Sequence, residues 1–127
     1  MNMTNNETKT ILYVEDDADF RQAIRTMLEA GGYAMVEAST AEEGLEQYRQ
    51  HQPDLLLVDL MMEEVDAGTN LVTQLRADGV SVPIYLLTSL GDTLATIKNS
   101  DELGIAGVLQ KPVRAQTLLA ILKTKLG

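Results

Sequence analysis

Short apolar runs alternate with amphipathic segments along this chain, and the alternation predicts strands and helices in turn. Continuous runs of Leu, Ile and Val are typical of strands that are buried on both faces of a sheet. Five strands are predicted in this way: Thr10–Val14, Tyr33–Ala38, Leu55–Asp59, Val82–Leu87 and Gly107–Gln110. Pro83 is compatible with the fourth strand because it lies near its start.

The segments between these strands carry apolar residues at the spacing of a helix. In the first segment, the i, i+3, i+4, i+7, i+8 stripe that should face the core consists of Phe20, Ala23, Ile24, Met27 and Leu28. Gly31-Gly32 is expected to end this helix. Thr40 and Glu43 form a capping-box pattern at the start of the second helix. Five helices are predicted, the fourth with a weak pattern: Ala18–Ala30, Thr40–Gln50, Thr69–Ala77, Thr93–Leu103 and Arg114–Leu126.

Strands that alternate with helices imply right-handed crossovers and a parallel sheet covered on both faces. The chain is therefore predicted to be an α/β protein with a single domain over residues 10–127. Residues 1–9 are polar, and we expect them to form a disordered tail.

Composition and charge exclude several classes of function. The 127 residues contain no cysteine, so a disulfide framework and thiolate chemistry are excluded. No apolar stretch is long enough to span a bilayer, and the N-terminus lacks the apolar core of a signal peptide. We therefore expect a cytoplasmic protein. The net charge of −9 argues against direct binding of nucleic acid and of anionic membranes by this domain.

Chemically active side chains fall where the predicted strands end. Glu15 and Asp16 follow the first strand, Asp59 ends the third, Thr88 follows the fourth, and Lys111 follows the fifth. Because ligands bind at the carboxyl edge of an open α/β sheet, we expect these side chains to meet there. Each residue alone is equally compatible with a cap, a turn or a solvated surface. The set indicates phosphoryl transfer onto a carboxylate.

The residue types fit that reaction. A carboxylate nucleophile and a phosphoryl donor are both anionic, so a cation must bring them together, and Mg²⁺ prefers carboxylates, waters and phosphate oxygens. Asp16 and Asp59 can supply two ligands, while Glu15 is expected to hold a metal-bound water. Lys111 and Thr88 can then bind the phosphoryl oxygens. Asp17 is interpreted mainly as a cap of the first helix.

The ordered set V-E-D, L-L-L-V-D-L, L-L-T-S and K-P resembles the receiver domain of two-component response regulators. The resemblance covers Thr10 to Leu126. It implies a flavodoxin-like (βα)5 three-layer sandwich with strand order 2-1-3-4-5. It also implies that Asp59 accepts a phosphoryl group, with the backbone carbonyl of Met61 as a further Mg²⁺ ligand. Such a domain catalyses only its own phosphorylation and dephosphorylation.

The resemblance further implies partners. A sensor histidine kinase or a histidine phosphotransfer domain would donate the phosphoryl group, and a downstream protein would read the altered surface. The donor is expected to dock on the first helix and on the loop after Lys111. The surface residues there are Ala18, Gln22, Pro112 and Val113, flanked by Asp19, Arg21 and Arg25.

Some positions depart from the family pattern. Val108 stands where receiver domains usually carry an aromatic residue whose rotation accompanies activation. Glu63 replaces a usual proline, and the loop Leu60–Gly68 is one residue longer than expected. Transmission of the signal through Val108 is therefore the least conventional part of the assignment.

Three alternatives remain at this point. A degenerate receiver would act by protein contact alone, which Val108 leaves open. An aspartate-nucleophile phosphatase would need a second acid at position 61, where the chain has Met61. A flavin carrier would need a phosphate-binding loop after the first strand, where carboxylates would instead repel a phosphate.

Overall fold

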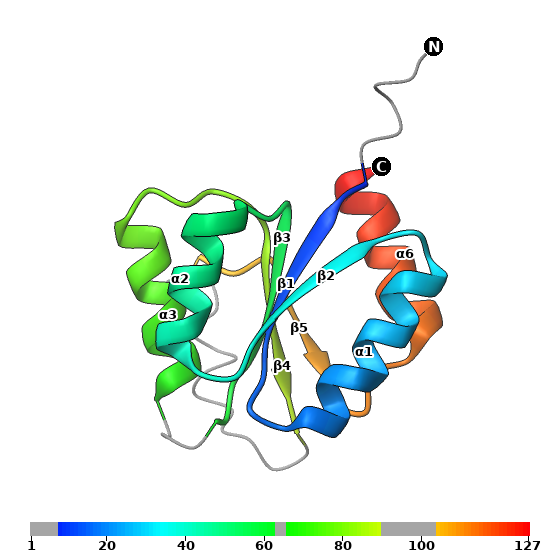
Figure 1. Ribbon diagram of the computed structural model, residues 1–127, viewed down its shortest axis with the longest axis horizontal. Coiled ribbons are helices and arrows are strands. Elements are labelled where there is room, and N and C mark those ends of the chain that lie inside the picture. Colours follow the sequence, from blue (N-terminus) through cyan, green and yellow to red (C-terminus); the bar gives the residue numbers. More distant parts are fainter. Residues whose placement is uncertain (1–7, 63–65, 90–103) are drawn as a thin grey trace.

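Five parallel strands form one sheet in the order β2-β1-β3-β4-β5, as predicted (Figure 1). This computed structural model describes residues 8–62, 66–89 and 104–127. The strands are β1 Thr10–Val14, β2 Ala34–Ala38, β3 Leu55–Asp59, β4 Ile84–Thr88 and β5 Gly107–Gln110. The helices within the described ranges are α1 Ala18–Ala30, α2 Ala41–His51, α3 Ala67–Ala77 and α6 Ala115–Leu126.

The sheet lies between two layers of helices. Helices α1 and α6 cover one face, and α2 and α3 cover the other (Figure 1). Because successive side chains of a strand point to opposite faces, the core divides into two clusters. One contains Ile11, Tyr13 and Leu57 on the α1 and α6 side, and the other contains Leu12 and Val58 on the α2 and α3 side. Burial on both faces explains why the inner strands β1, β3 and β4 read as nearly unbroken apolar runs, whereas the edge strand β2 includes Glu37.

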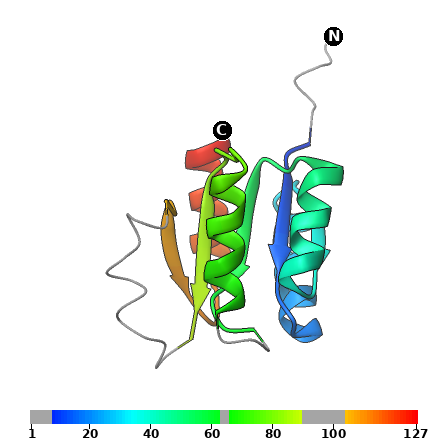
Figure 2. The same cartoon turned by 90° about the vertical axis from the view of Figure 1, so that its left-hand side faces the viewer.

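All the strands run in the same direction, so their carboxyl ends lie at one edge of the sheet. Figure 2 shows the arrowheads pointing to the edge opposite the N-terminus. The registers Val14↔Val58 and Asp59↔Leu87 bring the ends of β1, β3 and β4 level with one another. This edge carries the predicted chemistry.

The helix ends follow local capping rules. Asp17 caps α1, as predicted, because its Oδ1 accepts hydrogen bonds from the backbone N–H groups of Asp19 and Phe20. Thr40 caps α2 through the N–H of Glu43. The Glu43 carboxylate accepts from the N–H of Ser39 at 2.6 Å, so the reciprocal bond of the capping box reaches one residue further back than the pattern predicts.

Several element boundaries differ from the prediction by one or two residues. Strand β4 begins at Ile84 rather than Val82, because Pro83 has no N–H to donate to the ladder. Strand β2 begins at Ala34 rather than Tyr33, and α3 begins at Ala67 rather than Thr69. The predicted helix Thr93–Leu103, residues 1–7 of the predicted tail, and Glu63 lie outside the described residues.

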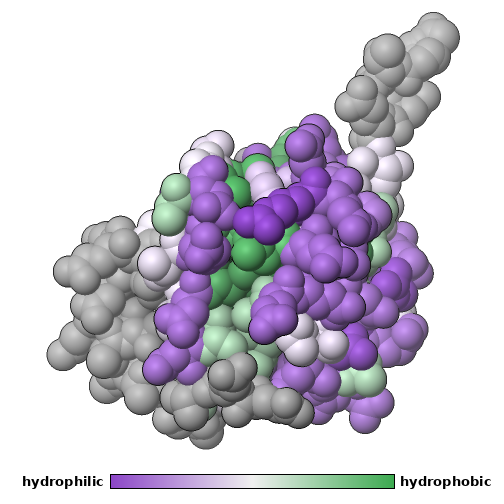
Figure 3. Space-filling view, turned by 60° about the vertical axis from the view of Figure 1, so that its left-hand side comes forward, coloured by the Kyte–Doolittle hydropathy of each residue, from purple (hydrophilic) through white to green (hydrophobic). Residues whose placement is uncertain are grey.

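The outer face of the α2 and α3 layer is mainly hydrophilic. Figure 3 shows a band of hydrophobic surface between hydrophilic side chains on this side of the molecule.

None of the helices in the described ranges has the length and apolar character needed to cross a membrane.

Candidate functional site

The polar residues predicted from the sequence converge at the carboxyl edge of the sheet. Glu15 directly follows β1, Asp59 ends β3 and Thr88 ends β4. Within the described part of the chain, these three residues are the buried polar or charged ones, with exposed fractions of 1%, 3% and 6%. Buried charges require partners, and Lys111, directly after β5, supplies one.

Lys111 bridges the two buried carboxylates. Its Nζ lies 2.6 Å from Glu15 Oε1 and 3.2 Å from Asp59 Oδ1. The backbone N–H of Lys111 also donates to the carbonyl of Thr88 at 2.7 Å, which fixes the lysine against the end of β4. The Lys111–Pro112 peptide bond is cis. The prediction that Lys111 and Asp59 meet is therefore matched by the geometry, with Glu15 as the nearer partner of the ammonium group.

Glu15 is held by several donors at once. The hydroxyl of Tyr13 donates to Oε1 at 2.8 Å, and the N–H of Asp17 donates to Oε2 at 3.2 Å. Arg21 binds the Glu15 backbone carbonyl at 2.7 Å. This carboxylate is therefore fixed in orientation by the protein itself.

The acidic residues form a group suited to a divalent cation. Glu15, Asp16 and Asp59 each offer one carboxylate oxygen, and these oxygens lie within 4.8 Å of one another. Such an all-carboxylate set fits Mg²⁺, which binds through a few carboxylates and retains waters. Met61, whose carbonyl was predicted to be a ligand, lies two residues beyond Asp59 with a half-exposed side chain.

Burial and neighbouring charges move the pKa values of the site. Burial, together with the negative charge of Glu15, raises the pKa of Asp59 from 3.8 to about 7. Burial acts in the same direction on Glu15, but hydrogen bonds from Lys111 and Tyr13 outweigh it and lower the pKa of that carboxyl. Burial disfavours the Lys111 ammonium, but its bonds to the carboxylates dominate and raise its pKa. In the metal-free pocket, Glu15 therefore stays ionised more readily than Asp59, whose charged form is disfavoured.

Phe20 departs from the sequence prediction. It was expected on the buried stripe of α1, but its exposed fraction is 36%. The residue lies in the first turn of α1, close to the sheet edge, and its ring centroid is 4.1 Å from Lys111 Nζ. A cation over an aromatic face at this distance is attracted to it. The helical spacing alone could not identify Phe20 as part of the site.

Tyr13 was also not predicted as a site residue. The sequence pattern predicts it only as part of the apolar run of β1, and its exposed fraction is 0%. Residues i and i+2 share a face of a strand. The spacing of Tyr13 and Glu15 in the sequence therefore indicates that their side chains can meet.

The first turn of α3 fits tightly against the end of β3. A Cβ at Gly68 would overlap the backbone carbonyl oxygen of Asp59 and would also meet the carbonyl oxygen of Leu60. Only glycine allows this approach without displacing the segment that carries Asp59.

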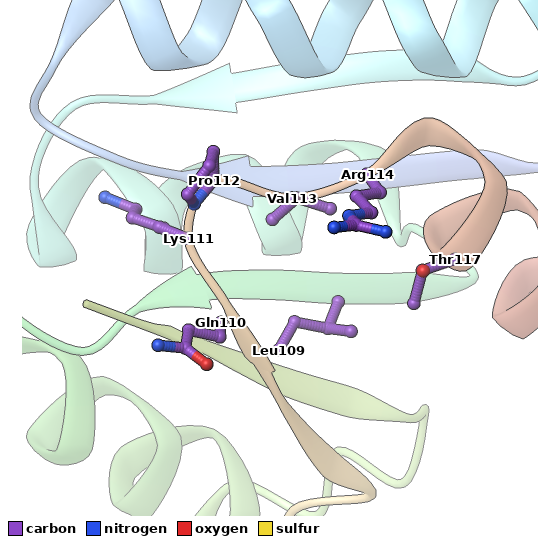
Figure 4. A pocket seen from close by; sticks show the side chains of 7 residues that line it. All are labelled: Leu109, Gln110, Lys111, Pro112, Val113, Arg114 and Thr117. Carbon is purple, nitrogen blue, oxygen red and sulfur yellow. The ribbon is translucent and has the colours of Figure 1, made fainter. Parts of the chain in front are cut away.

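A groove lies beside the site, between the end of β5 and the first turn of α6. Its volume is about 390 Å³, and residues 109–114 and 117 line it. Figure 4 shows the Lys111 side chain pointing away from Arg114 and Thr117. The loop after β5 therefore presents Lys111 to the acidic residues on one side and the groove on the other. Pro112 and Val113, predicted as docking residues, lie in this loop.

The sequence was compared with family profiles and with curated proteins. The sequence profile of the response regulator receiver domain matches residues 11–123. The chain is 37% identical over 121 residues to a Guillardia theta protein named "Probable transcriptional regulator ycf27", covering 94% of this chain and 46% of that protein. It is 34% identical to the phosphate regulon transcriptional regulatory protein PhoB of Pseudomonas aeruginosa, covering 93% of this chain and 52% of PhoB. The chain thus spans about half the length of these curated relatives.

A solved structure shows the same fold. The receiver domain protein (CheY-like) of Methanospirillum hungatei superposes with a TM-score of 0.86 at 28% identity, over 94% of each chain. Family profile, relatives and fold all point to one assignment, and the chain belongs to the response regulator receiver domain family.

Proposed function

We propose that Asp59 is the phosphoacceptor of this receiver domain and that Lys111, Thr88 and a Mg²⁺ ion support the transfer. The observation that carries the proposal is the position of Asp59. It is buried at the end of β3, 3.2 Å from Lys111 Nζ and grouped with the carboxylates of Glu15 and Asp16. A general acidic surface would not bury a carboxylate beside a lysine.

The transfer requires little rearrangement of covalent structure. A carboxylate oxygen of Asp59 forms a bond to phosphorus, the P–N bond of a phosphohistidine breaks, and the imidazole leaves with the electron pair. Mg²⁺, when bound by Asp16 and Asp59, would neutralise charge on the phosphoryl oxygens. Lys111 moves its ammonium group from the carboxylates to those oxygens, and the Thr88 hydroxyl donates to them.

The family and the position of the site together support a docking surface for the phosphoryl donor. A sensor histidine kinase or a histidine phosphotransfer domain would dock against α1 and the loop at Pro112 and Val113. These elements border Asp59. Ala18 is an exposed residue at the start of α1, so a partner can approach there. A downstream protein would read the phosphorylated state, and the whole process would take place in the cytoplasm.

Output cannot use the usual aromatic rotation. Val108 lies half-buried in β5, opposite Leu86 of β4. We propose that movement of Thr88 toward the phosphoryl group is transmitted through the ends of β4 and β5 themselves. Apart from its own phosphorylation and dephosphorylation, the domain would catalyse no reaction.

Intact mass spectrometry with acetyl phosphate tests the assignment. The wild-type chain should gain one phosphoryl group in Mg²⁺ and none in chelator, and Asp59→Asn should gain none. Asp54→Asn is a matched control, because Asp54 precedes β3 at its opposite end and accepts from the N–H of Thr10. Phosphorylation of Asp59→Asn to the wild-type level would refute the assignment.

A further inference from the structure

Tyr13 is a buried tyrosine whose hydroxyl donates a hydrogen bond to a carboxylate of the acidic site. It lies in β1, packs in the core cluster on the α1 and α6 side, and donates to Glu15 Oε1 at 2.8 Å. Lys111 Nζ contacts the same oxygen at 2.6 Å. One carboxylate oxygen is thus shared between a neutral donor, the Tyr13 hydroxyl, and a charged one, the Lys111 ammonium group.

The shared oxygen matters because Lys111 cannot pair with Glu15 and bind the phosphoryl oxygens at the same time. Before phosphorylation its ammonium group is closer to Glu15 than to Asp59. To bind the phosphoryl oxygens it must leave Glu15, which would abandon a buried carboxylate. A buried charge that loses its partner is strongly disfavoured, so the departure is easier when Glu15 keeps another donor.

We propose that Tyr13 is a positioning residue for phosphoryl acceptance: its hydroxyl holds and partly compensates Glu15, so that Lys111 can move from Glu15 to the phosphoryl group. The inference rests on the proposed function of Asp59. Because β1 is an interior strand, held between β2 and β3, Tyr13 cannot follow Lys111 and remains a donor to Glu15 in both states.

A purely structural role predicts something different. A buried tyrosine hydroxyl needs a hydrogen-bond partner, and Glu15 would simply be that partner. In that case, replacing Tyr13 with phenylalanine would change folding stability alone. Under the proposal, it would strengthen the hold of Glu15 on Lys111 and impair binding of a phosphoryl group.

The experiment measures beryllofluoride affinity by calorimetry and the rate of phosphorylation by acetyl phosphate, both at saturating Mg²⁺. Tyr13→Phe should weaken the affinity and slow the rate by about tenfold, since hydrogen bonds to charged groups are among the stronger ones. Tyr85→Phe, which alters another buried tyrosine of the same cluster, should leave both within about twofold of wild type.

A double-mutant cycle shows whether the effect passes through Glu15. In a Glu15→Gln background, Tyr13→Phe should add little, because a neutral amide holds the ammonium group much more weakly than a carboxylate does. An equal effect in both backgrounds would overturn the proposal, as would a Tyr13→Phe protein that matches wild type.

A spectroscopic readout keeps the test valid even if Tyr13→Phe folds poorly. The chain has no tryptophan, so tyrosines dominate its near-ultraviolet absorption. When Mg²⁺ and beryllofluoride draw Lys111 away, Glu15 becomes a stronger acceptor, and the tyrosine band should shift to longer wavelength. Wild type and Tyr85→Phe should show the shift and Glu15→Gln should lose it. An unchanged shift in Glu15→Gln would contradict the proposal. Failure of Asp59 phosphorylation in the wild type would instead refute the function itself.

Discussion

Replacing Asp59 with asparagine should stabilise the metal-free protein, by an amount that grows with pH. The pKa of Asp59 is raised from 3.8 to about 7 in the folded state, by burial and by Glu15. Between these pH values the folded chain binds more protons at this site than the unfolded chain does. Stability is therefore present below pH 4 and is lost as pH rises toward 7. An asparagine side chain does not titrate and escapes that loss.

The magnitude follows from the pKa difference. A difference of about 3 corresponds to about 4 kcal/mol at 1.36 kcal/mol per pKa unit. Relaxation of the pocket and the weaker attraction of asparagine for Lys111 will reduce this figure, so we expect a gain of roughly 2–4 kcal/mol at pH 8. For a domain of this size that corresponds to about 10 °C in melting temperature. At pH 4.5 most of the gain should be absent.

Urea unfolding followed by far-ultraviolet circular dichroism, in chelator at pH 4.5, 6, 7 and 8, measures the effect. Asp78→Asn is the control for net charge, because Asp78 is an exposed residue at the end of α3, paired at 3.5 Å with Arg49. It should change stability by no more than about 0.5 kcal/mol at any pH. A gain for Asp59→Asn that does not vary with pH, or a loss at pH 8, would refute the shared acidic pocket.

Three further outcomes are expected. Lys111→Ala leaves Glu15 and Asp59 without their cation and should lower the free energy of unfolding in chelator by about 3 kcal/mol. Saturating Mg²⁺ should restore most of this stability, and equal losses with and without Mg²⁺ would contradict the bridge between the two carboxylates. Phe20→Ala removes the ring over Lys111 and should reduce beryllofluoride affinity several-fold, for a contribution of about 1 kcal/mol, and Phe20→Tyr should retain the wild-type affinity. Ala18→Trp should slow phosphotransfer from a histidine phosphotransfer domain about tenfold while leaving acetyl phosphate reactivity unchanged; equal slowing by both donors would place the defect in the pocket.

The fold and most of the site could be predicted from the sequence because both depend on short-range patterns. Unbroken apolar runs such as Leu55–Asp59 identify strands buried on both faces. Alternation with helices then fixes parallel strands, and parallel strands place their final residues at one edge. Asp59, Glu15 and Lys111 could therefore be brought together without coordinates.

Other features of the site depend on distances between side chains, which the pattern of apolar and polar residues does not give. The helical stripe that includes Phe20 does not reveal that the first turn of α1 lies beside the site rather than over the core. The order of residues also does not show that Lys111 is nearer to Glu15 than to Asp59, because this depends on side-chain packing. The apolar run from Val82 also does not show where β4 begins, because the strand starts only after Pro83, which has no N–H to donate to the ladder.

The close approach of Gly68 to the Asp59 carbonyl has a consequence for how this domain tolerates changes in length. Whatever its length, the chain that leaves β3 must deliver a residue without a side chain to one point against the Asp59 backbone. Insertions engineered ahead of Gly68 should therefore be accepted only where they leave the buried Leu60 and Met62 in place, whereas a single methyl group at Gly68 would displace the phosphoacceptor segment. Loop length and loop endpoint are thus under separate constraints, and libraries that vary the first while preserving the second should remain folded.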